Sequence, residues 1–185
     1  MSDPLQHALH SVAVHSPLLS ALAVFCAASL LFVLIAVFVV LGLTRVRRVT
    51  WLQVARMVAS LGIAGLLTLV LKHLVHDPRP FMVEHYAPLT HASSDNGFPS
   101  DHTLIAALLA GWVWWLDRRW LALFIVGVLL VMLGRLAIGA HHTLDVLGSL
   151  AFAGLGLALA ALVLFSPAWE RPVLPGRPPK KGTPT

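Results

Sequence analysis

The chain has 185 residues, of which 58% are hydrophobic and only 11% are charged, and its formal net charge is +5. Soluble domains average about 25% charged residues, so this composition excludes a soluble protein and indicates an integral membrane protein. The net positive charge alone would suit a nucleic-acid partner, but it is distributed as in the loops of a membrane protein, and we expect no nucleic acid to bind.

Five apolar stretches are the candidate membrane spans, and they follow one another within one helical domain. A helix needs about 20 apolar residues to cross a bilayer, and four of the five approach or exceed that length. The stretches are residues 18–43, 51–71, 103–116, 120–138 and 144–165. The third is short, and it reaches across the hydrocarbon only if its helix begins a turn earlier. The predicted fold is an all-α bundle of about five transmembrane helices.

The two ends of the chain lie outside this transmembrane domain, which we place at residues 18–165. Residues 1–17 contain no Lys or Arg and precede an apolar run too long for the core of a signal peptide. We therefore expect an uncleaved extracytoplasmic segment there. Residues 166–185 are rich in Pro, Gly and basic residues, which predicts a disordered basic tail in the cytoplasm.

The basic residues indicate which side of the membrane each loop faces. Ten of the thirteen Lys and Arg residues fall on one side of a five-span arrangement, and by the positive-inside rule that side is cytoplasmic. All ten histidines lie on the other side with the remaining cations, Lys72, Arg79 and Arg135. Each of these cations could be a snorkelling anchor at a helix end, but together they are candidates for function.

Polar residues of the outer face form three clusters. The first, K-H-L-V-H-D-P-R-P (72–80), ends the second span, and the second, F-P-S-D-H (98–102), begins the third. The third cluster, R-L-A-I-G-A-H-H-T-L-D (135–145), joins the fourth span to the fifth. Helix junctions on one face of a bundle can converge, and the three cations would then suit a group with several negative oxygens. Because guanidinium groups bind phosphate bidentately, we predict a phosphate site.

The second cluster predicts a helix start. Ser100 follows a proline and precedes an apolar run, so its hydroxyl can cap the helix while free N–H groups of the first turn bind an anion. A serine nucleophile would need a base beside it, and His102, two positions on, points to another face of a helix. Asp101 can be a first-turn acid favoured by the helix dipole or a member of the site, and both interpretations stay open.

The third cluster supplies a better nucleophile. His141 and Asp145 are four residues apart, which places them on one face of a helix that begins here. A carboxylate on one imidazole nitrogen orients the ring and leaves the other nitrogen free to attack phosphorus. We predict that His141 is the nucleophile, that Asp145 supports it, and that His102 is the general acid that protonates the leaving oxygen.

The remaining outer histidines could bind a metal, but their pattern does not favour a metal site. His73, His76, His85 and His91 provide no H-x3-H pair on a well-predicted helix, and no cysteine or carboxylate pattern accompanies them. We expect neither a metal ion nor another cofactor.

In this order, K-x6-R-P, P-S-x-H and R-x5-H-x3-D resemble the three-part signature of the type 2 phosphatidic acid phosphatase superfamily of membrane phosphatases. The matching residues are Lys72, Arg79, Pro80, Pro99, Ser100, His102, Arg135, His141 and Asp145. The resemblance covers roughly residues 51–165. It implies metal-free hydrolysis of a phosphomonoester or diphosphate through a phosphohistidine on His141, which Asp145 supports while His102 protonates the leaving group. It also implies phosphate binding by Lys72, Arg79, Ser100 and Arg135.

Two positions depart from the commonest form of that signature. Gly134 stands where a serine often precedes the arginine of the third motif, which removes a possible hydroxyl contact. Asp101 stands where P-S-G-H has glycine, and F-P-S-D-H together with the earlier R-P-F resembles bacterial undecaprenyl-diphosphate phosphatases of the bacitracin-resistance type. That branch implies a polyprenyl lipid substrate of cell wall biogenesis and an active site on the outer face of the plasma membrane.

The sequence therefore predicts a membrane lipid phosphatase that most resembles an undecaprenyl-diphosphate phosphatase. The same chemistry on phosphatidylglycerol phosphate, phosphatidate or another lipid phosphate is the nearest alternative. From a different class, the chain could be an inactive membrane protein or a proton-coupled transporter. An inactive relative would be expected to have lost a reacting residue, and a transporter would bury its ionisable groups near mid-membrane rather than at one end of its spans.

Overall fold

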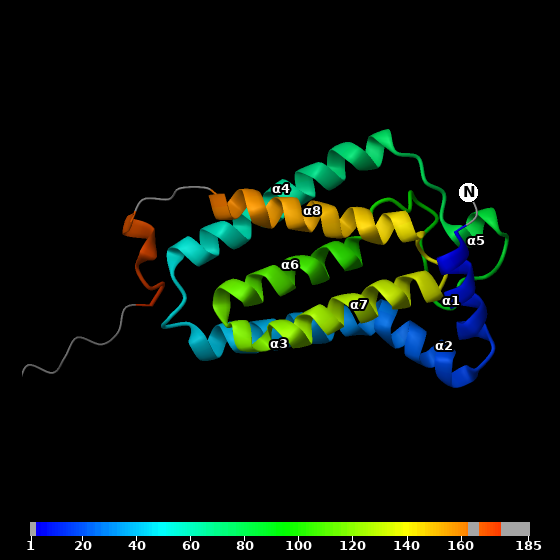
Figure 1. Cartoon of the computed structure of the whole chain (residues 1–185), viewed down its shortest axis with the longest axis horizontal. Helices are drawn as coiled ribbons and strands as arrows, with labels where there is room; N and C mark the ends of the chain where they lie inside the picture. The colour runs from blue at the N-terminus through cyan, green and yellow to red at the C-terminus, as the bar shows by residue number, and fades with distance from the viewer. Residues whose placement is uncertain (1–2, 163–166, 175–185) are drawn as a thin grey trace, which may run out of the picture.

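The computed structural model describes residues 3–162 and 167–174, and helices make up nearly all of their regular structure (Figure 1). The α-helices are α1 (Pro4–Val14), α2 (Pro17–Val24), α3 (Leu30–Arg45), α4 (Trp51–Leu74), α5 (Pro80–Val83), α6 (Asp101–Leu116), α7 (Leu121–Ala137) and α8 (Thr143–Leu162). A π-helical turn joins α2 to α3, and short 3-10 turns cover Arg118–Trp120 and Pro167–Glu170. The predicted all-α fold is confirmed.

In the part of the chain that the structure describes, four helical stretches are long and apolar enough to cross a membrane, and they coincide with four of the predicted spans. They are Pro17–Arg45, Trp51–Leu74, Arg118–Ala137 and Thr143–Leu162. Large apolar side chains such as Leu18, Leu66 and Leu133 are exposed on their outer surfaces. Contiguous apolar surface of this kind marks the part of a protein that contacts lipid or a partner, and in a membrane bundle it faces lipid.

The remaining predicted span, the third at residues 103–116, corresponds to α6, which has only 16 residues and begins at Asp101, inside the second motif, as predicted. At about 1.5 Å per residue it is roughly 24 Å long, shorter than the ~30 Å hydrocarbon core. It packs against α3, α4, α7 and α8, and its Leu108 and Val113 side chains are fully buried. Because other helices surround it, α6 need not match the bilayer thickness as the lipid-facing helices do.

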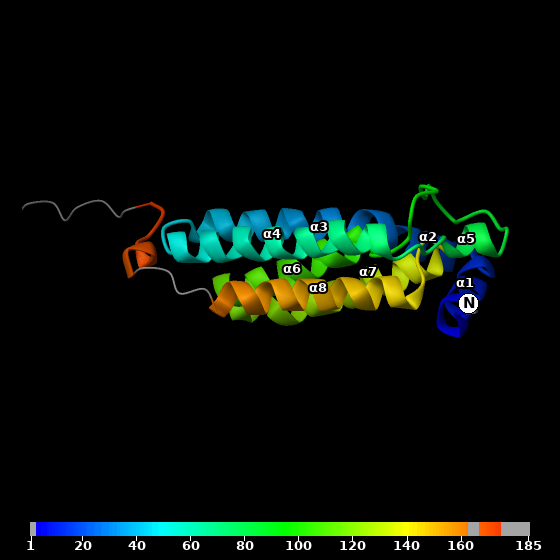
Figure 2. The ribbon, with the colours of Figure 1, turned by 90° about the horizontal axis from the view of Figure 1, so that it is seen from above.

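The junctions between helices lie at two opposite ends of the bundle. The N-terminus, α5 and the α7–α8 junction lie at one end, and the α3–α4 junction and residues 167–174 lie at the other (Figures 1 and 2). All three sequence clusters of the predicted outer face fall at the first end. The bundle therefore has one end rich in reactive side chains and one that carries most of the arginines.

The N-terminal segment forms a helix that packs on α7, which its composition did not predict. Asp3 begins α1 as its N-cap and accepts a hydrogen bond from the Gln6 backbone N–H at 3.1 Å. The Gln6 side chain is fully buried and donates to the Tyr86 hydroxyl at 3.0 Å and to the Leu136 carbonyl at 3.3 Å. These contacts join α1 to the end of the bundle that holds the motifs.

Part of the C-terminal segment contacts the start of α4 and the junction before it. The Val173 N–H donates to the Val49 carbonyl at 2.8 Å, and the Trp51 N–H donates to the Arg171 carbonyl at 3.1 Å. These backbone bonds hold the segment against the α3–α4 junction, where α4 offers free N–H groups at its start. Residues 175–185 of the predicted tail lie outside the described residues.

Candidate active site

The three sequence motifs come from different helices and meet at one end of the bundle. Lys72 lies in the last turn of α4, Arg79 precedes α5, and Arg135 lies in the last turn of α7. His141 lies in the junction between α7 and α8, while Asp145 lies in the first turn of α8. Each side chain is therefore placed by a helix end, which explains how residues up to 73 positions apart form one site.

His141 is the centre of the site, and its two ring nitrogens have different partners. Nε2 lies 3.0 Å from Arg135 Nη2 and 3.4 Å from Arg79 Nη1. Nδ1 lies 2.9 Å from the Gly97 carbonyl and 3.3 Å from Asp145 Oδ2. Arginine can only donate and a carbonyl can only accept, so Nδ1 carries the proton and Nε2 presents a lone pair.

The surroundings of His141 keep its imidazole neutral. The side chain is almost completely buried. Burial, followed by the positive charges of Arg135 and Arg79, lowers the pKa of His141 well below its usual value. A neutral imidazole whose free nitrogen lies between two guanidinium groups can attack the phosphorus of a phosphate that those groups bind.

Asp145 holds the other side of the imidazole ring and is fully buried. Its Oδ2 accepts the His142 backbone N–H at 2.7 Å as well as facing His141 Nδ1. A Cβ added at Gly97 would lie 3.2 Å from this Oδ2 and 3.1 Å from the Asp77 carbonyl, so a larger residue would press against both neighbours. The sequence analysis missed Gly97, because its role depends on its carbonyl rather than on a side chain.

Arg79 is fixed in orientation by the loop that precedes α6. Its Nε donates to the Asp95 carbonyl at 3.1 Å, its Nη2 donates to Asp95 Oδ1 at 2.7 Å, and its Nη1 donates to the Ala140 carbonyl at 3.0 Å. Asp95 Oδ2 also lies 3.5 Å from Lys72 Nζ, so one carboxylate pairs both cations of the first motif. Hydrogen bonds from Ser93 and Arg79 lower the pKa of Asp95 to about 2.

Arg135 is buried, and its Nε has no hydrogen-bond partner in the described part of the chain. A buried guanidinium N–H without an acceptor is unfavourable, and it is satisfied when an anion binds beside it. Because the same guanidinium group contacts His141, that anion would lie next to the lone pair of Nε2. This geometry fits a phosphate oxygen.

Ser100 occupies the N-cap position of α6, but its side chain makes no capping hydrogen bond, and this corrects the prediction. The fully buried hydroxyl instead accepts a hydrogen bond from Thr103 Oγ1 at 3.2 Å. The hydroxyl is turned toward Thr103, so it does not receive an N–H of the first turn. Ser100 therefore lies at the site without holding the helix start in the predicted way.

The two other members of the second motif lie in the first turn of α6. Asp101 is exposed and His102 is partly buried. His102 is close enough to Arg135, Arg79 and His141 to interact with them electrostatically, and Asp101 interacts in the same way with His102 and Arg135. His102 is thus near enough to the site for its charge to act on His141.

Among the described residues, no group of three or more His, Cys, Asp or Glu side chains is arranged to hold a metal ion. His73, one of the outer histidines, instead lies 2.7 Å from the Leu69 carbonyl of its own helix through Nδ1. The charge at the site therefore comes from Lys72, Arg79 and Arg135, which can neutralise an anion without a bound cation.

Comparison with known proteins identifies relatives of this chain. A family described as the PAP2 superfamily matches residues 53–169. Undecaprenyl-diphosphatase BcrC of Bacillus subtilis is 28% identical over 161 residues, which cover 83% of this chain and 79% of that protein. Putative undecaprenyl-diphosphatase YbjG of Escherichia coli is 29% identical over 153 residues, with 80% and 75% covered.

Two solved structures share the fold. The crystal structure of a transmembrane PAP2 type phosphatidylglycerolphosphate phosphatase from Bacillus subtilis is 26% identical, with a TM-score of 0.61 over 84% of this chain and 82% of that one. Aquifex aeolicus LpxE is 20% identical and has a TM-score of 0.66 over 85% of this chain and 92% of that one. The second supports the fold alone.

Proposed function

The chain belongs to the PAP2 superfamily and is a membrane lipid phosphatase, and from that premise we propose that it removes phosphate from undecaprenyl diphosphate. Both BcrC and YbjG are named as undecaprenyl-diphosphatases, YbjG with the prefix "putative", and each aligns with at least 80% of this chain. The neutral His141 between Arg79 and Arg135 supports the phosphatase chemistry.

The proposed reaction begins with the terminal phosphate in contact with Lys72, Arg79 and Arg135. His141 Nε2 attacks phosphorus, a P–N bond forms, and the bond from phosphorus to the bridging oxygen breaks. His102 donates a proton to that oxygen, which leaves as undecaprenyl phosphate. The imidazole is then positively charged, and the Asp145 carboxylate stabilises that charge through Nδ1–H.

The second half of the proposed reaction releases phosphate. His102 is now neutral, so it can accept a proton from a water molecule that attacks the phosphohistidine. The P–N bond breaks, inorganic phosphate leaves, and His141 returns to its neutral state with the proton still on Nδ1. No step needs a metal ion, because the three cations balance the charge of the transferred group.

The proposal also includes the location of the site, in a bacterial plasma membrane with the active site on the extracytoplasmic side. The opposite end of the bundle carries Arg45, Arg118 and Arg119, among other basic residues, and positive loops stay in the cytoplasm. An outward site would meet the lipid diphosphate on the side where the resemblance places that branch of the family.

A second candidate substrate is phosphatidylglycerol phosphate, because the structural relative that is 26% identical is named for that activity. Purified protein, with EDTA in excess, should be given undecaprenyl diphosphate, phosphatidylglycerol phosphate and phosphatidate in matched micelles. We expect the highest kcat/KM with undecaprenyl diphosphate and no phosphate release from His141→Ala. A higher value with phosphatidylglycerol phosphate would replace the proposed substrate, and release that requires a divalent ion would contradict the mechanism.

A further inference from the structure

The two oxygens of the Asp145 carboxylate are not equally satisfied. Oδ2 accepts the His142 N–H and faces His141 Nδ1, as described above. Oδ1 is buried and has no conventional donor among the described residues. A buried carboxylate oxygen is strongly disfavoured without a donor, so a group beside Oδ1 is expected to supply a proton.

Asp77 is the candidate for that group. Its carboxyl group is close enough to that of Asp145 for the two to interact as hydrogen-bonding partners, although neither side chain carries a donor when ionised. The backbone of Asp77 is fixed on both sides, since its N–H donates to Asn96 Oδ1 at 2.9 Å and its carbonyl accepts the Gly97 N–H at 2.8 Å. A hydrogen bond between the two carboxyl groups requires one proton shared by the pair.

The proton belongs on Asp77 rather than on Asp145. Oδ2 of Asp145 already accepts hydrogen bonds that favour the ionised form, whereas Asp77 makes no comparable set of contacts with its side chain. Burial, followed by the hydrogen bond and the negative charge of Asp145, raises the pKa of Asp77 to about 6. The charges of His142 and His141 act in the opposite direction and are weaker.

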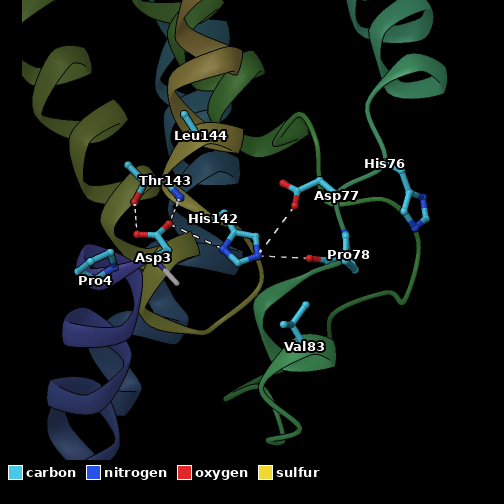
Figure 3. Close-up of a pocket in the computed structure, with 9 residues that line it drawn as sticks. All are labelled: Asp3, Pro4, His76, Asp77, Pro78, Val83, His142, Thr143 and Leu144. Atoms are coloured by element: carbon cyan, nitrogen blue, oxygen red, sulfur yellow. Dashed lines mark hydrogen bonds and ion pairs between the residues drawn. The ribbon is translucent and has the colours of Figure 1, made fainter. Parts of the chain in front are cut away.

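Asp77 can exchange its proton with solvent, because its side chain lies at a cavity of the molecule (Figure 3). Its carboxyl group lines a cavity of about 430 Å³ together with Asp3, His76 and His142, and its side chain is 27% exposed. His142 lies between the two acids, with Nε2 4.0 Å from Asp77 Oδ1 and Nδ1 3.8 Å from Asp3 Oδ2. Asp145, by contrast, is fully buried.

We propose that neutral Asp77 is a positioning residue of the reaction, which donates a hydrogen bond to Asp145 Oδ1 and so fixes the carboxylate that orients His141. This rests on the proposed function, in which His141 is the nucleophile. When Asp77 ionises, the donor is lost and two negative charges lie side by side. Asp145 then turns away from its partner, and the imidazole loses its alignment.

The groups that face Asp77 determine the pH at which its carboxyl group ionises. Asp145 raises its pKa, and His141 and His142 oppose that effect, while Asp3 lies on the far side of His142 and Arg79 acts on Asp145. The net result is that Asp77 is neutral below pH about 6 and ionised above it. The kcat/KM of the wild type should therefore contain a fall as the pH rises through that value.

The test compares Asp77→Asn with Asp77→Ala in the purified full-length enzyme, using undecaprenyl diphosphate across the pH range. The Asn side-chain amide donates to Asp145 Oδ1 at every pH, so this variant should keep wild-type activity at low pH and lose the part of the fall that Asp77 causes. Any fall caused by deprotonation of the general acid His102 stays the same in both proteins and cancels in their ratio. The ratio of its kcat/KM to that of the wild type should rise with pH through about 6. Asp77→Ala has no donor, and we expect a loss of about tenfold even at low pH.

Glu84→Gln is the matched control, because Glu84 is another acid at this end of the bundle and pairs with exposed His7 rather than with Asp145. Its pH profile should follow the wild type. Equal activity of the Asn and Ala variants, or a ratio of Asp77→Asn to wild-type kcat/KM that does not change with pH, would overturn the inference. Should Asp77→Ala fail to fold, the Asp77→Asn profile decides alone. Phosphate release by His141→Ala would instead contradict the proposed function.

Discussion

Burial, and then the same two arginines that would bind the phosphate, keep His141 neutral. Both effects oppose protonation of Nε2, which leaves the lone pair available. A bound phosphate brings negative charge and offsets those guanidinium charges. The positive imidazole that forms with the P–N bond is then no longer opposed, and it is stabilised by Asp145 on the other side. The site therefore favours the charge change only when substrate is present.

Asp95 illustrates a residue whose role the sequence did not reveal. It was one of several acids on the predicted outer face, without a motif to mark it. In the structure its carboxylate pairs Arg79 and Lys72, and its carbonyl accepts from Arg79 Nε. Because the side chain is half exposed, these pairs hold the geometry of the two cations more than they stabilise the fold.

His141 and His102 have different proposed roles, so variants of the two histidines should respond differently to the leaving group of the substrate. His141→Ala should abolish turnover of every substrate, because no P–N bond can form. His102→Ala should lose roughly 10²–10⁴-fold with a lipid phosphomonoester, whose alkoxide needs a proton as it leaves. The loss should be much smaller with p-nitrophenyl phosphate. Steady-state kcat/KM for both substrates measures this difference.

The trapped intermediate provides the control for that experiment. A phosphoenzyme that is labile to acid, stable to base and absent from His141→Ala is the expected species. An acid-stable phosphoenzyme that disappears in Ser100→Ala would show that the serine is the nucleophile. Ser100→Ala should otherwise keep measurable activity, since its hydroxyl bonds to Thr103 rather than to a base.

At the scale of helices, the elements that depend on local composition could be predicted from the sequence. The elements that depend on tertiary contacts could not. The long apolar runs gave the four spans, and the motif gave the start of α6 at Asp101. The helix of the N-terminal segment depends on the contacts of Gln6 with Tyr86 and Leu136, which are 80 and 130 positions away, and no local pattern reports them. The order of residues 167–174 depends likewise on pairing with the α3–α4 junction.

The same distinction holds for the candidate site. Lys72, Arg79, Arg135 and His141 could be predicted because charged groups at the ends of apolar spans are rare and point to function. Gly97 and Asp77 act through a carbonyl and through a neutral carboxyl group, which only the folded loops bring to His141 and Asp145. The Ser100 cap was wrong because the choice between two hydroxyl partners depends on side-chain packing.

The N-terminal helix should stabilise the active site through Asp3. Its carboxylate accepts the Gln6 N–H in α1, and it also accepts the Thr143 N–H at 2.5 Å and the Thr143 hydroxyl at 2.9 Å. One side chain therefore caps α1 and the start of α8, which carries Asp145. Asp3→Ala should lower stability by about 1 kcal/mol or more and reduce kcat. Thermal unfolding and kcat on the same preparation measure both.

The pH dependence of that stabilisation has a definite sign. Burial acts to raise the pKa of Asp3, but the hydrogen bonds from Thr143 and Gln6 outweigh it, and the pKa lies below its usual value. The stabilisation is therefore complete above the unfolded pKa and is lost as the pH falls through the folded pKa. Ser11→Ala, which removes only an exposed bond within α1, is the control and should change neither quantity. An Asp3→Ala variant as stable and active as the wild type would contradict the role.

At the scale of the whole molecule, the two ends of the bundle differ in charge and in chemistry. The site end holds Lys72, Arg79 and Arg135, and each of these faces the site, whereas the other end holds arginines such as Arg118 that contact aromatic rings or solvent. The cations that depart from the positive-inside pattern are thus those to which the proposed function gives a binding role. The remaining basic residues predict the orientation in the membrane.

That asymmetry predicts which end reacts with a reagent outside the cell. In a Cys26→Ala background, which removes the native thiol, cysteine would replace His91 in the exposed loop before α6 or Arg118 at the opposite end. A membrane-impermeant maleimide added to intact cells should label His91→Cys and not Arg118→Cys, because the basic end stays in the cytoplasm. Both should be labelled once the cells are permeabilised, which shows that each thiol is accessible, and phosphatase activity of each variant shows that it is folded.

Labelling of Arg118→Cys alone in intact cells would invert the orientation. A phosphatase with that orientation would take its lipid from the cytoplasmic leaflet, so the same experiment tests where the substrate must be supplied.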